Sequence, residues 1–311
     1  IAAFLHGAGF TGSGERYLSS TVGVEGCADG TVRLLVSSTE FGQGTSTVLC
    51  QVAAEALGLP YENVQIAQPD TAQVPNSGPT VASRTAMVVG NLVRSAALGI
   101  KQTLTASGAL PAPYSPAQFR EACRKYISKR GDLRSFARYE APPGVFWDDD
   151  NYRGEAYAAY AWAVYVAEVA VDLVTCGVDV KDFVALQEVG RVLHPVLAKG
   201  QIAGGVAQGI GFALYEKVIW QDGRMLNGQM TNYIMPTSAD LPPIRVFFEE
   251  LGNVHGAYGA KGIGELPMDG PAPAVVNAIE DALGIRFDSI PLMPEDIFAA
   301  VSEETCADGV R

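Results

Sequence analysis

The chain has 311 residues, of which 48% are hydrophobic and 18% are charged, and its formal net charge is -12. This composition is typical of a globular protein with a core large enough for two subdomains. The acidic balance, without a basic stripe, disfavours binding to nucleic acid or to an anionic membrane. No apolar run reaches membrane-spanning length and the first residues carry no signal pattern, so we expect a cytoplasmic protein.

The five cysteines are odd in number and far apart: Cys27, Cys50, Cys123, Cys176 and Cys306. This spacing fits neither a disulfide framework nor the ligand spacing of a zinc or iron-sulfur site. We therefore expect most of them to be buried thiols.

The first third of the chain predicts a hairpin, a helix, a strand and a second helix. Strands over 19–26 and 32–38 flank an Asp29-Gly30 turn, and apolar residues spaced for one helix face run from 45 to 57. A short strand over 63–68 and a helix ending near 104 follow. The same order returns after residue 153: a hairpin, a Gly-rich helix over 199–217, a strand over 244–249 and a final helix over 271–283.

This repetition predicts an α+β fold of two hairpin-helix-strand-helix subdomains with mixed sheets. We place the first subdomain at 1–105 and the second at 153–311. Residues 106–152 form a connecting excursion, whose basic stretch over 120–138 we interpret as a solvated helix face, with partner contact as the alternative.

Glycines crowd around one carboxylate, Glu265, in the stretch 256–268. Ile263, Leu266 and Pro267 beside it favour partial burial, and a partly buried carboxyl group suits proton transfer near neutral pH. The alternative is a solvated glutamate on a flexible surface loop.

A second unusual stretch, Phe41-Gly42-Gln43-Gly44, opens the first helix. The free N–H groups of a helix N-terminus suit an anion, although ordinary capping by Thr45 or Ser46 would explain the same residues. Further hydroxyl groups, Thr80, Ser83 and Thr85, begin the next helix and could cap it or bind a polar ligand.

The chain resembles the molybdenum hydroxylases, the xanthine dehydrogenase and aldehyde oxidase family, and in particular the C-terminal half of their molybdopterin-binding subunit. Each matching motif is weak alone, but together they occur in family order over nearly the whole chain. The exceptions are residues 106–152, which match no part of the pattern. The matching motifs are Gly-Phe-Thr at 9–11, Phe-Gly-Gln-Gly at 41–44, Val-Pro-Asn at 74–76 with Pro-Thr-Val-Ala-Ser at 79–83, Gly-Gln at 200–201, Asn-Tyr-Ile-Met-Pro-Thr at 232–237 and Lys-Gly-Ile-Gly-Glu-Leu-Pro at 261–267.

The resemblance implies a role for each matching residue. Glu265 matches the catalytic glutamate that acts as general base, and Phe10 and Thr11 match residues that contact a planar substrate. Val81 and Ala82 match small residues near the metal, which the pterin dithiolene holds, so that no protein side chain ligates it. The positions that match cofactor-binding residues are Gly42, Gln43, Gly44, Thr80, Val81, Ala82, Ser83, Thr85 and Gln201.

The resemblance also implies a molybdopterin cofactor, whose nucleotide form, such as a cytosine dinucleotide, stays open. Iron-sulfur clusters and FAD would lie on partner subunits or domains, together with an N-terminal half or sister subunit that completes the molybdenum site. The substrate would be an N-heteroaromatic (purine-like) compound or an aldehyde. Two alternatives are a non-catalytic ligand-binding or assembly module and, more weakly, a dinucleotide-binding enzyme, whose Gly-x-Gly-x-x-Gly context is missing.

Overall fold

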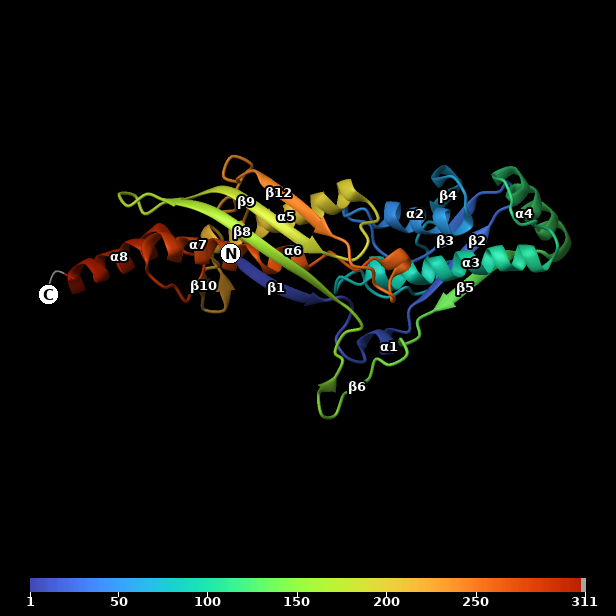
Figure 1. The fold of residues 1–311 in the computed structure, drawn as a ribbon, viewed down its shortest axis with the longest axis horizontal. Coiled ribbons are helices and arrows are strands. Elements are labelled where there is room, and N and C mark those ends of the chain that lie inside the picture. Colours follow the sequence, from blue (N-terminus) through green and yellow to red (C-terminus); the bar gives the residue numbers. More distant parts are fainter. Residues whose placement is uncertain (309–311) are drawn as a thin grey trace.

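In the computed structural model, which describes residues 1–308, two four-stranded sheets with their helices lie one after the other along the longest axis (Figure 1). Each sheet packs one face against helices and forms its own hydrophobic core. The mixed α+β architecture expected from the sequence is confirmed.

The first sheet has the strand order β4-β3-β2-β5, in which β3 and β4 are parallel and the other pairs antiparallel. Its inward side chains, such as Val24 and Leu34, are completely buried because two helices cover this face. The strands are β2 (Thr21–Gly26), β3 (Val32–Leu35), β4 (Val64–Ile66) and β5 (Leu133–Arg138). The helices of this unit are α1 (Gly14–Leu18), α2 (Thr45–Leu57), the short 3-10 helix η1 (Tyr61–Asn63), the π-helical segment η2 (Thr85–Val89), α3 (Gly90–Ala106) and α4 (Pro116–Arg130).

The second sheet has the strand order β1-β8-β9-β12, in which only β9 and β12 are parallel. Along β8, alanines and Tyr165 alternate with exposed residues such as Trp162, because one face lies on helices and the other is open. The strands are β1 (Ala2–Gly7), β8 (Tyr160–Val171), β9 (Val178–Glu188) and β12 (Ile244–Glu249). The helices are α5 (Pro195–Leu214), the 3-10 helix η3 (Ala257–Gly259), α6 (Leu266–Asp269), α7 (Pro271–Leu283) and α8 (Pro294–Asp308).

The predicted repeat of hairpin, helix, strand and helix is confirmed in both units: β2-β3-α2-β4-α3 and β8-β9-α5-β12-α7. Two strands, β1 and β5, do not follow the predicted subdomain boundaries. β1 pairs with β8, although residues 1–105 were assigned to the first subdomain, and β5 pairs with β2, although it falls in the region 106–152. Each of them covers an edge that the hairpin would otherwise leave unpaired. The division into domains stays a prediction.

The region 106–152 is more structured than an excursion. Besides β5 it contains α4, which begins with a capping box between Ser115 and Gln118, and β6 (Trp147–Asp148), which pairs with β7 (Arg153–Gly154) just after the region. The basic side chains Arg124 and Lys125 are 68% and 60% exposed on α4. Residues 133–138 of the predicted helix face form β5 instead. A second small hairpin pairs β10 (Trp220–Gln221) with β11 (Arg224–Met225).

The sequence prediction of α7 as the last helix is wrong, because α8 follows it. Gly284 does end α7, in the left-handed conformation at φ 72°, as its position predicts. The chain then turns through 285–293 and a new helix begins at Pro294, a residue that is well suited to a first helical turn.

The cysteine prediction is confirmed for Cys50, Cys123 and Cys176, which are buried, whereas Cys27 is partly exposed. Burial raises the pKa of Cys50 to about 11 and that of Cys123 to about 12. Cys306 lies outside the described side chains. Within residues 1–308, no helix is both long and apolar enough to cross a membrane.

Candidate functional site

A cavity with a volume of about 370 Å³ lies where the two units meet. Its walls come from the start of α2, the loop 80–86, the segment after β9, the first turns of α5 and the loop 260–265. Gly42, Phe10 and Thr11 are not among the lining residues. The predicted site residues that do line it are Gln43, Gly44, Thr80, Val81, Ala82, Ser83, Thr85, Gln201 and Glu265.

The sequence had suggested that the N-terminus of α2 could bind an anion from outside the chain. In the structure its N–H groups already have a partner. Glu40 accepts hydrogen bonds from the backbone N–H groups of Gly42 (2.8 Å), Gly44 (3.1 Å) and Ser46 (2.9 Å), so the chain's own carboxylate occupies these donors. Partial burial works against the ionised form of Glu40, but the three N–H bonds outweigh it and lower the pKa.

The two predicted glutamines differ in what their side chains already bind. Gln43 Nε2 donates to the carbonyl of Thr39 and to the hydroxyl of Thr45, both at 2.8 Å, and its Oε1 accepts from the N–H of Phe41. It therefore stabilises its own loop. Gln201, in contrast, has no side-chain hydrogen bond to any described residue and lines the cavity.

The loop between Thr80 and Arg84 holds an unusual backbone. Ala82 and Ser83 have φ values of 54° and 48°, a left-handed conformation that costs on the order of 1 kcal/mol or more for a residue with a Cβ. The N–H of Gly9 donates to the carbonyl of Ala82 at 2.9 Å, which fixes the turn from one side. On the other side, a Cβ on Gly262 would lie 1.5 Å from the carbonyl oxygen of Ser83, so this position admits only glycine.

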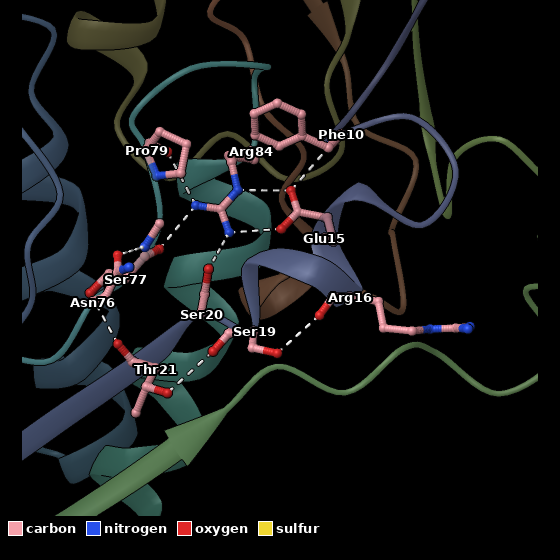
Figure 2. A network of polar contacts seen from close by, with 11 residues as sticks. Phe10, Glu15, Arg16, Ser19, Ser20, Thr21, Asn76, Ser77, Pro79 and Arg84 are labelled. Carbon is pink, nitrogen blue, oxygen red and sulfur yellow. Dashed lines mark hydrogen bonds and ion pairs between the residues drawn. The ribbon is translucent and has the colours of Figure 1, made fainter. Parts of the chain in front are cut away.

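Arg84 anchors this strained loop from inside the protein (Figure 2). Its side chain is fully buried, and Nε and Nη2 each donate to a carboxylate oxygen of Glu15 at 2.7 Å. Nη2 also donates to the hydroxyl of Ser20, and Nη1 donates to the carbonyls of Ser77 and Pro79. Because Glu15 accepts from the N–H of Phe10 as well, the pair ties the loops 9–15 and 77–84 together.

Glu265 is positioned by close packing between α5 and α6. A Cβ on Gly205 would lie 2.4 Å from Pro267, and one on Gly209 would lie 2.6 Å from Pro271. These glycines weaken α5 by roughly 1 kcal/mol each, and they let the start of α6 and of α7 approach its backbone. Part of the Gly-rich pattern of this helix is therefore explained by packing within the chain, whereas Gly200 and Gly204 face open space.

Ser83 and Glu265 bind each other twice across the cavity wall. The N–H of Glu265 donates to Ser83 Oγ at 3.0 Å, and Ser83 Oγ donates to Glu265 Oε2 at 3.1 Å. The side chain of Glu265 is 54% exposed, so it is only about half buried. Its neighbours Leu266 and Pro267 are buried instead, because they turn inward as α6 begins.

His6, which the sequence analysis did not single out, contacts Glu265. Its Nε2 lies 3.3 Å from Glu265 Oε2 and its Nδ1 lies 2.7 Å from Asp269 Oδ2. The hydrogen bond to Asp269 raises the pKa of His6, with a smaller contribution from Glu265, and partial burial opposes both. Nothing in the local sequence signals this contact, because 259 and 263 residues separate the partners.

Phe10 lines a second cavity of about 420 Å³ together with Trp147 and Tyr157, whereas Thr11 is not among its lining residues. The hydroxyl groups of Thr11 and Tyr157 are hydrogen-bonded. The structure thus separates the two predicted substrate residues from the first cavity, although the Gly9–Ala82 hydrogen bond joins the two loops.

Comparison with known proteins decides the family of the chain. The family described as molybdopterin cofactor-binding domain matches residues 1–242. The chain belongs to this family. The resemblance to the molybdenum hydroxylases that the motifs had indicated is confirmed, and molybdopterin is the cofactor of the domain.

Three relatives illustrate the similarity. The chain is 31% identical over 282 residues to the xanthine dehydrogenase molybdenum-binding subunit of Escherichia coli O157:H7, covering 87% of the chain and 38% of the relative. It is also 31% identical over 300 residues to the 6-hydroxypseudooxynicotine dehydrogenase complex subunit gamma of Paenarthrobacter nicotinovorans, covering 91% and 37%. The aldehyde oxidoreductase of Desulfovibrio desulfuricans has a TM-score of 0.81 at 29% identity, covering 96% of this chain and 32% of that one. The chain therefore spans less than two fifths of the length of these relatives.

The residues around the first cavity fit a large, polar, anionic cofactor. The cavity volume lies within the usual range for ligand sites, and the Gln201 amide and the Thr85 hydroxyl make no side-chain hydrogen bond to any described residue. Lys261 and Arg191 add positive charge to the lining, although Lys261 also pairs with the buried Glu188. Within the described residues no group of three or more His, Cys, Asp or Glu side chains could hold a metal ion.

Proposed function

We propose that this chain is the molybdopterin-binding part of a molybdenum hydroxylase that uses Glu265 as its general base. The observation that carries the proposal is that Glu265 lies in the wall of the cavity that also contains Gln201 and the strained turn at Ala82 and Ser83. A carboxylate beside a cavity for a redox cofactor is suited to take a proton from the reacting group.

The bound cofactor would supply the redox chemistry and a water-derived oxygen. The chain's own residues orient the base. Glu265 Oε2 accepts from Ser83, whereas Oε1 has no partner among the described residues and stays available for a proton. Gln201 and Thr85 would bind the pterin, and the Ala82–Ser83 turn would let the backbone approach it closely.

The substrate would be an N-heteroaromatic compound or an aldehyde, and Phe10 and Thr11 would contact it from the side of the second cavity. Relatives named as an aldehyde oxidoreductase and as a xanthine dehydrogenase subunit support this range. Because the chain covers only 38% of the xanthine dehydrogenase subunit, an N-terminal half or sister subunit would complete the site. Iron-sulfur and flavin partners would carry the electrons away.

The test is the substitution Glu265→Gln in the complete protein from its own host. The amide cannot accept the proton but keeps the shape, so kcat should fall by at least about 100-fold. Molybdenum and pterin content, measured by elemental analysis and fluorescence, should be unchanged. Glu62→Gln, an exposed residue of η1, is the matched control and should leave both quantities unchanged.

Near-normal turnover by the Glu265→Gln protein would remove Glu265 from the base role. A wild-type protein that folds well and contains no molybdenum would favour the non-catalytic binding module instead.

A further inference from the structure

One side of α6 presents two carboxylates to the same histidine. Glu265 precedes the first residue of α6 and Asp269 is its last residue, so they are one helical turn apart. Like charges at this spacing repel each other and destabilise a helix. His6, at the end of β1, lies between them and contacts one oxygen of each.

The geometry favours one protonation state of this histidine. An ionised carboxylate can only accept hydrogen bonds, and a neutral imidazole carries one N–H. Since both ring nitrogens lie within hydrogen-bonding distance of a carboxylate oxygen, at 2.7 and 3.3 Å, both contacts can be hydrogen bonds to ionised carboxylates only when both nitrogens carry a proton. His6 is then an imidazolium that bridges Asp269 and Glu265.

We propose that His6 is a positioning residue for Glu265: held by Asp269, the imidazolium binds Oε2 and fixes the orientation of the carboxylate, with Oε1 free. This rests on the proposed role of Glu265 as general base. Ser83 and His6 converge on the same oxygen from different elements, which fixes the rotation of the carboxylate. A half-exposed glutamate would otherwise sample several rotamers.

Among the described residues, His6 forms ion pairs only with Asp269 and Glu265. From β8, the neighbouring titratable group is Tyr165, which is buried and hydrogen-bonded to Gln187, and burial raises its pKa. From α7, Glu280 and Asp281 form no ion pair with the histidine. The raised pKa of His6 agrees with the geometry, and its first-named cause is the Asp269 hydrogen bond.

Ethoxyformylation with diethyl pyrocarbonate tests the bridge without any activity measurement, because the reagent reacts with a histidine only when its imidazole is neutral. The modification rate at each histidine is followed against pH by peptide mass spectrometry of the complete protein. The chain has three histidines, so His194 and His255 are internal controls.

We expect the pH midpoint of His6 modification to shift to lower pH in Asp269→Asn and, by less, in Glu265→Gln. Asp281→Asn, an exposed residue of α7, should not move it. An unchanged His6 midpoint in Asp269→Asn would overturn the proposal.

Turnover measurements then separate the charge of His6 from its hydrogen bond. His6→Gln keeps a donor but not the charge, so we expect a lower kcat at unchanged KM and molybdenum content, and loss of the alkaline limb of the kcat profile. His6→Ala should lower kcat further. Wild-type kcat and pH profile in His6→Ala would overturn the positioning role.

The failures of the two proposals can be told apart. If Glu265→Gln stays active, the general-base proposal fails. If Glu265→Gln is inactive but the pH midpoints of His6 modification do not move, only the His6 bridge fails.

Discussion

At the scale of single residues, the site depends on a charge that has no access to water. Arg84 is fully buried and the side chain of Glu15 is only 8% exposed, so each would be an uncompensated charge without the other. Removing one partner of such a buried pair typically costs about 3–5 kcal/mol. Arg84 also directly follows the strained residues Ala82 and Ser83, so its five hydrogen bonds hold a backbone conformation that those residues would otherwise avoid.

We therefore predict that Arg84→Met lowers the free energy of unfolding by about 3–5 kcal/mol in urea titrations of the complete protein. Arg124→Met is the matched control, since Arg124 is 68% exposed on α4 and its one ion pair within the described residues is with the surface residue Glu121; its effect should be close to zero. The double variant Arg84→Met with Glu15→Gln should recover part of the loss. Equal losses of unfolding free energy in Arg84→Met and Arg124→Met would contradict a structural role for the buried pair.

At the scale of elements, α2 carries its own anion. Glu40 binds three N–H groups at the N-terminus of the helix, where a negative charge is stabilising. Because the pKa of Glu40 is lower in the folded state, its contribution is fully present above its unfolded pKa and is lost as the pH falls through the folded value. We predict that Glu40→Gln lowers the free energy of unfolding at pH 7 by on the order of 1 kcal/mol or less, given the exposure of the side chain.

The same measurement at acidic pH checks the cause. The difference between wild type and Glu40→Gln should shrink as the pH falls, since the wild-type carboxyl group then takes up its proton. Glu55→Gln, near the C-terminal end of the same helix, is the control and should be neutral or slightly stabilising. A difference that stays constant down to low pH would show that the charge of Glu40 does not act on the helix.

The helices and strands also show which parts of the structure the sequence could predict. The start of α2, both ends of α7 and the whole of β12 agree with the predicted ranges, because local signals such as periodicity, Pro271 and Gly284 define them. The membership of β1 in the second sheet could not be predicted, since it depends on pairing with residues some 160 positions away. The His6 bridge was missed for the same reason. Glu40 was missed although it lies close to Gly42, because a glutamate before a Gly-rich turn has no fixed geometry in sequence.

At the scale of the whole molecule, the first cavity depends on both units. The loop 80–86 belongs to the first and the loop 260–265 to the second, and Ser83 and Glu265 join them by two hydrogen bonds. A ligand that binds between two units stabilises both sides at once, because opening either side must first release it. The cofactor should therefore couple the local stability of two loops whose hydrogen-bonded residues, Ser83 and Glu265, are 182 positions apart.

We predict that hydrogen exchange, followed by mass spectrometry, slows in peptides covering 80–86 and 260–265 together when the cofactor is bound. The comparison is between the complete protein from its own host and the same protein from a host that cannot make molybdopterin. Peptides covering 116–130 are the internal control, since α4 lines none of the first cavity. Protection of one loop without the other would mean that the cofactor rests on a single unit, and the cavity between the units would then not be its binding site.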